Sequence, residues 1–376
     1  MDTNKFRSRQ ERKPLSLPKG KDYIIALDMG YSAVKGFCET GYFCFPSYAK
    51  KLEENMINLP DTRDIMYRNE ETGEIYLVGY NAQNMADGTN DTEGELFSRR
   101  RYTGERFRIL CQTAVGLASM NKPSDRKISI QTGLPASYMK DIGDLKKAFT
   151  SMPTFSLRVG TEKTWTTFEL KVKEEDIYVM EQPKGALYST LIYNNGAYTK
   201  DAMSMLKGSV IVMDAGFRTF DFYGIRDRRV ECHESIDDIG MYQVFSQTVK
   251  KIEENFGEEI RVPTLQRHLS TGLITCVTEE TMGSEEVEFG TFLEEANKEV
   301  FETAKSMIRS ITNAFRGYQY VIVDGGTGEA WYGKICDWLK GMKTLRVFPS
   351  NLNDKLPFIY SNARGYYMYR YTAEKR

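Results

Sequence analysis

Short apolar runs recur along the chain, and most are bounded by glycine, proline or an acidic residue. Such runs predict β-strands, and they lie at residues 23–27, 32–37, 41–45, 75–78, 128–132, 177–180, 209–213, 220–225, 229–235, 320–323 and 345–348. Apolar residues at helical spacing predict helices at residues 104–120, 184–194, 240–255, 292–315 and 362–369. Strands that alternate with helices in this way predict an α/β fold.

Two of the predicted strands end in the same pattern. Four apolar residues precede Asp28-x-Gly30 in the first half of the chain, and four apolar residues precede Asp214-x-Gly216 in the second half. The two copies lie 186 positions apart, which is about half of the 376 residues, and another predicted strand follows each of them. The repeat predicts two duplicated domains that face each other across a cleft.

The chemistry of these paired turns favours a phosphate ligand. A glycine after the strand allows a ligand to approach the backbone closely, and the N–H groups of such a turn bind anions. Two turns, one from each domain, are suited to a polyphosphate between them. Asp28 and Asp214 would then hold a hydrated Mg²⁺, because this ion keeps several of its waters.

A third turn follows the apolar run at residues 320–323 and reads Asp324-Gly-Gly-Thr-Gly328. Its glycines suit close backbone approach to a flat ring or a sugar. The residues from Gly328 onward resemble a P-loop motif, but Ile335 occupies the position at which a serine or threonine would bind Mg²⁺. A Walker-type site is therefore excluded.

Composition narrows the class of protein. Hydrophobic residues make up 41% and charged residues 27% of the chain, as in a soluble protein of two domains. The net charge of −1 argues against direct binding of nucleic acid or of anionic membranes. Two histidines and six dispersed cysteines without a C-x-x-C pair argue against a zinc site. Free thiols predict a cytoplasmic protein, and no apolar run reaches the ~20 residues that span a bilayer.

Charge is also unevenly distributed along the chain. Residues 1–20 carry six basic and two acidic side chains, which predicts a flexible basic arm. Residues 99–108 are rich in arginine and residues 279–302 are rich in glutamate. The two clusters either guide head-to-tail association of copies of the chain or form two solvated faces.

Five motifs, in this order, resemble those of the actin superfamily. They are the first phosphate motif at residues 28–37, the first connecting segment at 178–186, the second phosphate motif at 212–221, the adenosine motif at 324–328 and the second connecting helix at 362–366. The pieces at residues 130–135 and 362–365 are most similar to bacterial plasmid-segregation actins of the ParM type.

The resemblance implies an actin-like fold, in which two duplicated RNase H-like α/β domains surround a nucleotide cleft and each carries a smaller subdomain. Residues 21–200 would form domain I, with an insertion at about 46–100 and a C-terminal helix at about 360–376 that completes it. Residues 201–359 would form domain II, with an insertion at about 240–310.

The resemblance also implies the residues of the site. Asp28 and Asp214 would hold the metal ion and act in catalysis, and Lys35 would contact the phosphates. The water-positioning residue is Gln182 by the actin spacing or Glu181 by that of ParM-type relatives. The predicted nucleotide-binding residues are Met29, Gly30, Tyr31, Ser32, Lys35, Ala215, Gly216, Phe217, Arg218, Thr219, Gly325, Gly326, Thr327 and Gly328. Phe217 and Arg218 depart from the small residues that relatives have there.

A member of this superfamily would bind ATP or GTP with Mg²⁺ and hydrolyse it to control a head-to-tail filament of the chain. Plasmid or DNA segregation would then proceed through a DNA-binding adaptor protein, without direct contact between this chain and nucleic acid or membrane. Two alternatives remain open. One is a small-molecule kinase of the same fold, although the Gly-x-Gly-x-Asp pattern of sugar kinases is absent. The other is a cytoskeletal scaffold without a role in segregation.

Overall fold

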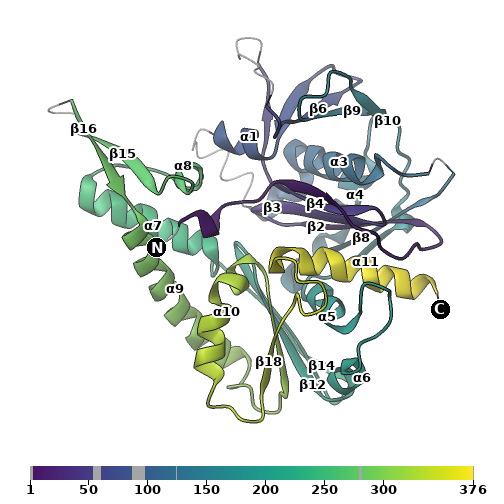
Figure 1. Cartoon of the computed structure of the whole chain (residues 1–376), viewed down its shortest axis with the longest axis vertical. Helices are drawn as coiled ribbons and strands as arrows, with labels where there is room; N and C mark the ends of the chain where they lie inside the picture. Colours follow the sequence, from purple (N-terminus) through teal and green to yellow (C-terminus); the bar gives the residue numbers. More distant parts are fainter. Residues whose placement is uncertain (1–2, 54–60, 87–97, 124, 279–281, 376) are drawn as a thin grey trace.

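The computed structural model describes residues 3–53, 61–86, 98–123, 125–278 and 282–375. They form two α/β domains, one above the other in Figure 1, with the C-terminal helix between them. No helix among these residues is both long and apolar enough to cross a bilayer.

Each domain contains a central sheet of the same design. In domain I five of the six strands have the order β4-β3-β2-β8-β11, and in domain II the order is β14-β13-β12-β17-β18. In both sheets the first three strands pair antiparallel and the last two join in parallel. The strands are β2 (Tyr23–Met29), β3 (Ala33–Cys38), β4 (Gly41–Pro46), β8 (Ile128–Leu134), β11 (Ile177–Glu181), β12 (Ser209–Ala215), β13 (Thr219–Arg226), β14 (Arg229–Asp237), β17 (Tyr320–Asp324) and β18 (Arg346–Pro349). The predicted α/β fold with duplicated domains is confirmed.

The strands that carry the repeated pattern lie at the centre of their sheets. Every residue of β2 and of β12 is buried, because helices cover both faces of each sheet. This explains why both strands read as continuous apolar runs without alternation. Asp28 and Asp214 therefore lie near the ends of these central strands, at the edge of the sheet where the following turn begins.

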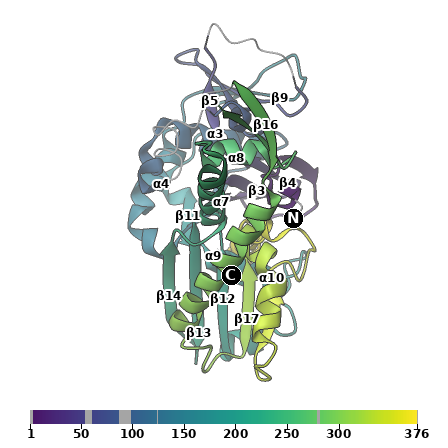
Figure 2. The ribbon, with the colours of Figure 1, turned by 90° about the vertical axis from the view of Figure 1, so that its left-hand side faces the viewer.

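Helices pack on the faces of the two sheets. In domain I they are α3 (Glu105–Ser119) and α4 (Ile142–Thr150), and in domain II they are α6 (Ala202–Lys207), α7 (Met241–Phe256), α8 (Val262–His268), α9 (Gly290–Ile311) and α10 (Gly326–Leu339). Figure 2 shows α9 and α10 in front of the second sheet, with α7 above them. Between the domains lie α5 (Pro183–Leu191) and α11 (Ser361–Glu374).

The insertion in domain I differs from its predicted bounds. A second sheet has the order β10-β9-β6-β7-β5, with β5 (Ala49–Lys51), β6 (Ile65–Asn69), β7 (Ile75–Val78), β9 (Phe155–Val159) and β10 (Thr166–Phe168), and α1 (Tyr80–Asn84) follows β7. The subdomain therefore includes residues 155–168, because β9 pairs antiparallel with β6. Residues 54–60 and 87–97 of the predicted insertion lie outside the described residues.

The subdomain of domain II contains α7, α8, α9 and the hairpin β15 (Leu273–Thr278) and β16 (Gly283–Glu288). The predicted end of its long helix is wrong. The helix α9 ends at Ile311 and not at residue 315, because Asn313, Ala314 and Phe315 have φ of 48°, 54° and 58°. These left-handed values cannot continue a right-handed helix.

The prediction of a flexible arm at residues 1–20 is wrong for its described part. A 3₁₀ turn, η1 (Thr3–Phe6), precedes the strand β1 (Glu11–Pro14), which pairs antiparallel with β4. Leu17 is buried in the core that contains α5 and α11. The edge of β4 presents backbone groups that need partners, so pairing orders a segment whose composition is that of a disordered one.

Two glycines let α5 and α11 cross in direct contact. A Cβ atom on Gly365 would lie 1.7 Å from the carbonyl oxygen of Gly185, and one on Gly185 would lie 2.7 Å from the Cα of Asn362. Next to the crossing, the fully buried Arg364 forms an ion pair with Asp354 and bonds to carbonyl oxygens at the end of α5. The two helices thus form one unit between the domains.

We expect Gly365→Ala to lower the free energy of unfolding by about 3 kcal/mol, because the added methyl group has to separate the two helix backbones. The matched control is Gly333→Ala, another helical glycine, whose Cβ would meet nothing within 4 Å. This control should stabilise α10 by about 0.5–1 kcal/mol. Urea unfolding of both variants measures the difference, and equal midpoints would show that the crossing tolerates a side chain.

Candidate functional site

The two repeated aspartates face each other from the ends of their strands. Asp28 on β2 is 4% exposed and Asp214 on β12 is 1% exposed. Lys35 lies opposite Asp28 in the β2–β3 register, and its Nζ is 3.1 Å from Asp28 Oδ2. Asp214 Oδ2 accepts a hydrogen bond of 2.7 Å from the side-chain amide of Asn362 on α11. Each predicted metal ligand is therefore held by a neighbour before any ligand binds.

A third buried carboxylate lies beside Asp214. Asp324 ends β17, directly across the parallel register from Asp214, and is fully buried. Ser350 Oγ donates to Asp324 Oδ1 at 2.5 Å, whereas Oδ2 has no hydrogen-bond partner among the described residues. The site thus contains an acidic oxygen that the protein itself leaves unsatisfied.

Burial and nearby acidic charges raise the pKa values of Asp324, Asp221 and Asp214. Burial is the largest cause that raises the pKa of Asp324 to about 7 and the pKa of Asp221 on β13 to about 6. Burial, together with the charges of Asp324 and Asp221, raises the pKa of Asp214 well above its ordinary value. Burial opposes the charge on Lys35, but Asp28 and its other acidic neighbours outweigh it and raise the Lys35 pKa. A bound cation would relieve the repulsion between the acids.

A cavity of about 540 Å³ lies between the domains, within the range of small-molecule sites. The predicted residues that line it are Asp28, Ser32, Lys35, Gln182, Asp214, Gly216, Phe217, Gly325, Gly326 and Thr327. An adjoining cavity of about 40 Å³ shares five of these residues and adds Met29, Gly30, Tyr31 and Thr219. The three turns predicted to hold a nucleotide therefore meet around one space.

Four predicted residues do not line these cavities. Ala215 and Gly328 lie behind the turns, where a Cβ on Gly328 would be 3.7 Å from the Cβ of Ala215. Arg218 forms an ion pair of 3.1 Å with Asp238, and Glu181 forms one of 3.1 Å with Lys184.

Of the two neighbouring candidates for positioning water, Gln182 borders both cavities. It lies at the start of α5, where its backbone N–H donates to Leu134 O at 2.7 Å. Glu181 is the last residue of β11 and is turned toward Lys184 and His233. The geometry therefore favours Gln182 over Glu181 for contact with a ligand.

Glycine is required sterically in two of the three turns. A Cβ on Gly30 would lie 2.7 Å from both Ala33 O and Lys35 Nζ. Gly325 has φ of 83°, and a Cβ there would lie 2.2 Å from Ala215 O. Glycine therefore allows the backbone of these turns to lie closer to neighbouring backbone and side-chain atoms than any other residue type would.

The predicted arginine patch is partly wrong. Arg101 is 4% exposed, donates to Gly30 O at 3.1 Å and lies over the ring of Tyr31. Arg99 forms an ion pair of 2.6 Å with Asp141. Arg101 therefore supports the first phosphate turn from behind. In the glutamate-rich region, Lys251 pairs with Glu299 at 3.0 Å.

Several cleft residues were not among the predicted site residues. Asn362 belongs to the motif at residues 362–366 that resembles the second connecting helix, and this motif is the one sequence signal for its role. Asp324 was considered only as part of a glycine-rich turn. Glu329 and Lys334 line the cavity from α10, and so do residues 5–9, from the segment predicted to be a flexible arm.

The residues present fit a magnesium ion. Buried carboxylate oxygens are the hard donors that Mg²⁺ prefers, and one of them is unsatisfied. No group of three or more His, Cys, Asp or Glu side chains among the described residues is arranged to hold a metal by itself. Water and phosphate oxygens would therefore have to complete the coordination.

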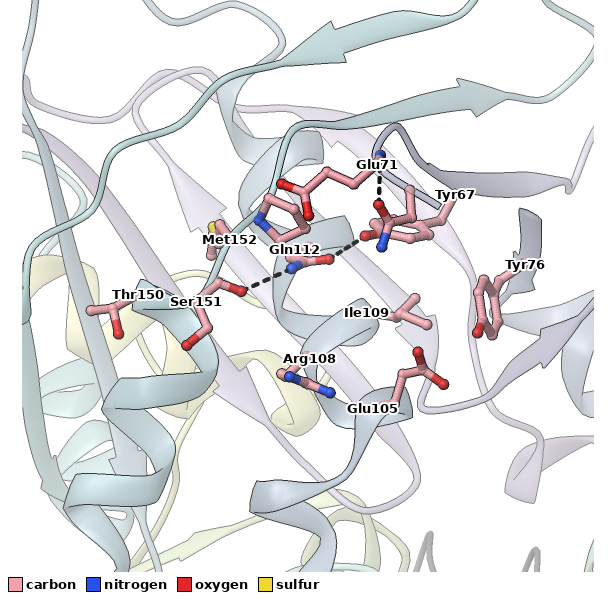
Figure 3. Close-up of a pocket in the computed structure, with 12 residues that line it drawn as sticks. Tyr67, Glu71, Tyr76, Glu105, Arg108, Ile109, Gln112, Thr150, Ser151 and Met152 are labelled. Carbon is pink, nitrogen blue, oxygen red and sulfur yellow. Dashed lines mark hydrogen bonds between the residues drawn. The ribbon is translucent and has the colours of Figure 1, made fainter. Parts of the chain in front are cut away.

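A separate cavity of about 460 Å³ lies between β6, β7, α3 and the end of α4. Tyr67 Oη donates to Gln112 Oε1, and Gln112 Nε2 donates to Ser151 O, while Glu105 and Arg108 lie at the opposite wall (Figure 3). None of the predicted site residues lines this cavity. It is therefore distinct from the cleft between the domains.

The fold and the cleft agree with comparisons to known proteins. Residues 26–185 match the family described as actin-like proteins, N-terminal domain. A ParM filament structure from Clostridium botulinum aligns with a TM-score of 0.69 at 20% identity, covering 94% of this chain and 99% of that one. The archaeal actin homologue Ta0583 in complex with ADP aligns with a TM-score of 0.61 at 18% identity, covering 94% and 100%. A search of curated protein sequences finds no match.

The chain thus has an actin-like fold. Residues 26–185 carry the actin-like N-terminal domain, and both domains together have the fold seen in ParM. The resemblance to the actin superfamily, and to its ParM type, is confirmed.

We expect Asp324→Asn to raise the melting temperature of the ligand-free protein at about pH 8 and to raise it by a smaller amount at about pH 5. The folded-state pKa of about 7 lies above the ordinary 3.8. The stability that the neutral acid contributes is therefore fully present below pH 3.8 and is lost as the pH rises from there to about 7. Asparagine keeps that neutral form at both pH values.

The matched control is Asp227→Asn, at an exposed turn position with φ of 50° that asparagine adopts readily. It should change the melting temperature little at either pH. An equal effect of Asp324→Asn at both pH values would contradict the repulsion between Asp324 and Asp214.

Proposed function

We propose that the chain binds a nucleoside triphosphate with Mg²⁺ in the cleft and hydrolyses it to control a head-to-tail filament of copies of itself. The observation that carries the proposal is the convergence of Asp28, Lys35 and Asp214 with the glycine-rich turn at Gly325 on one cavity of about 540 Å³. ATP and GTP are both candidates for the nucleotide.

Each group in the cleft has a role in this proposal. Asp28 and Asp214 hold the hydrated Mg²⁺, and Lys35 contacts the phosphates. The backbone N–H groups of the turns at Gly30 and Gly216 face the same anion, and the turn at Gly325 receives the base or the sugar. The metal ion supplies charge neutralisation when it is bound.

Hydrolysis would proceed by in-line attack of water on the γ-phosphate, with catalysis supplied by positioning and electrostatics. Gln182 would orient this water through its side-chain amide. It is suited to the task because its backbone is fixed at the start of α5, against the strand end of β8.

The filament is supported by two structures with the same fold, which are described as a ParM filament and an Alp12 filament. We propose that this chain likewise forms cytoplasmic filaments and acts in plasmid or DNA segregation. Because its net charge is −1, contact with DNA would run through a DNA-binding adaptor protein and not through this chain.

The first test is pelleting and light scattering with Mg²⁺ and ATP, GTP or no nucleotide, together with phosphate release. We expect a polymer that depends on nucleotide. Asp214→Ala should abolish phosphate release because it removes a metal ligand. Nucleotide consumption without a polymer, coupled to phosphorylation of a sugar or an acid, would favour a small-molecule kinase. A polymer that ignores nucleotide would favour a scaffold.

The second test separates the two neighbouring candidates for positioning water. We expect Gln182→Ala to slow phosphate release by about 100-fold while nucleotide binding is kept. Glu181→Ala is the matched control, because Glu181 is paired with Lys184, and it should stay within about twofold of the wild type. The reverse ranking would assign the role to Glu181.

A further inference from the structure

A segment at the start of the described chain crosses from one domain to the other over the cleft. We call residues 3–10 the strap. At its first end, Thr3 Oγ1 donates to Leu269 O in domain II at 2.7 Å, and Phe6 packs half-buried against the domain II core. At its other end the strap continues into β1 of the first sheet. Figure 1 shows the crossing as the purple segment between α7 and β4.

The middle of the strap is attached to the small subdomain of domain I. Arg7 Nη2 donates to Tyr80 Oη at 2.8 Å, and Gln10 Oε1 accepts from the backbone N–H of Tyr80 at 2.7 Å. The strap therefore contacts domain II, the small subdomain of domain I and the first sheet of domain I.

The strap is itself a wall of the cavity. Lys5, Phe6, Arg7, Ser8 and Arg9 line the same 540 Å³ space as the buried acids. Burial raises the pKa of Glu329 on α10, and the charge of Arg9 partly opposes that rise, so Arg9 acts across the cleft on domain II. Three cationic side chains thus border a space whose floor is acidic.

This separation of charge defines the ligand chemistry. A ligand that neutralises both sides needs a cation toward Asp28, Asp214 and Asp324 and an anion toward the strap. A complex of Mg²⁺ with a nucleoside polyphosphate has that arrangement. A neutral sugar or a lone metal ion does not.

We propose that the strap is part of the nucleotide site, with Lys5, Arg7 and Arg9 attracting the phosphates, and that its detachment from domain II controls nucleotide release. This proposal rests on the nucleotide binding proposed above. The two ends of the strap are unequal. The β1 end is held by a four-residue strand pairing, whereas the domain II end is held by the hydrogen bond from Thr3, worth about 1 kcal/mol, and by the half-buried ring of Phe6. The domain II end is therefore the one that opens.

The test uses the full chain and a fluorescent ATP analogue bound with Mg²⁺. Release is followed by stopped flow after the addition of excess unlabelled ATP. We expect the double variant Lys5→Ala, Arg9→Ala to release the analogue about 10-fold faster than the wild type, with a weaker dependence of the rate on salt. Thr3→Val keeps the shape of the side chain but removes its hydrogen bond, and it should speed release by about fivefold, as expected for the loss of about 1 kcal/mol.

Lys19→Ala is the matched control, because Lys19 is an exposed lysine of the same segment beyond β1. It should leave release within about twofold of the wild type. A wild-type chain that binds neither this ATP analogue nor the corresponding GTP analogue would overturn the nucleotide function itself. Binding with unchanged release in both strap variants would overturn the strap alone.

Limited trypsin digestion of the wild type provides a measurement that needs no variant. Cleavage after Lys5, Arg7 and Arg9 reports the detached strap and is identified by mass spectrometry. Mg²⁺ with ATP should slow cleavage at these sites by about 10-fold while cleavage after the exposed Lys19 stays unchanged. Equal rates with and without nucleotide would contradict the proposal.

Discussion

The rest of the structure depends on the crossing of α5 and α11. Gly185 and Gly365 bring the two helix backbones into contact, and the side chain of Asn362 fills the corner between them. Its Oδ1 accepts from Ala186 N–H at 2.9 Å, and its Nδ2 donates to Asp214 at 2.7 Å. One amide therefore connects the first turn of each helix to the acid of domain II, and Gln182 lies at the start of α5. A change in the crossing would move all of these groups together.

Contacts across the cleft hold the same relation between the domains elsewhere. Tyr48 Oη donates to Gln266 Oε1 at 2.9 Å, and Arg267 Nη1 donates to Asn84 O at 3.2 Å. On the other side of the molecule, Tyr138 Oη donates to Asp237 Oδ1 at 2.8 Å. Each is a single hydrogen bond, worth about 1 kcal/mol, so the helix crossing serves as the permanent connection while these bonds can exchange. The repulsion between the buried acids of the cleft favours binding of a cationic ligand there. The bound cation would remove an energetic cost that is already present in the folded chain.

Local patterns in the sequence predicted the parts of the site that depend on neighbouring residues. The apolar runs before Asp28 and Asp214 identify central strands, and the glycines that follow them identify the turns. They succeeded because a strand end and its turn are formed within about ten residues. Local patterns failed where a partner is distant in sequence. The strand β1 exists because β4 has an open edge, so the composition of the segment does not predict it, and β9 belongs to the small sheet because it pairs with β6.

The sequence by itself determined the duplicated strands and the identity of the two aspartates, because these follow from periodicity and spacing along one strand and its turn. The lysine opposite one of them was predicted from the resemblance to the actin superfamily. Tertiary structure alone decided which way side chains face and what they meet. It turned Glu181 toward Lys184 and Gln182 toward the cleft, and it buried Arg101 behind Gly30 although its neighbours suggested a surface patch. It also placed Asp324 beside Asp214 and laid the basic residues 5–9 along the cavity. The physical reason is that electrostatic and steric fit depend on distances between segments that lie far apart in the sequence, such as those of Gly30 and Arg101 or of Asp214 and Asp324, which no local pattern records.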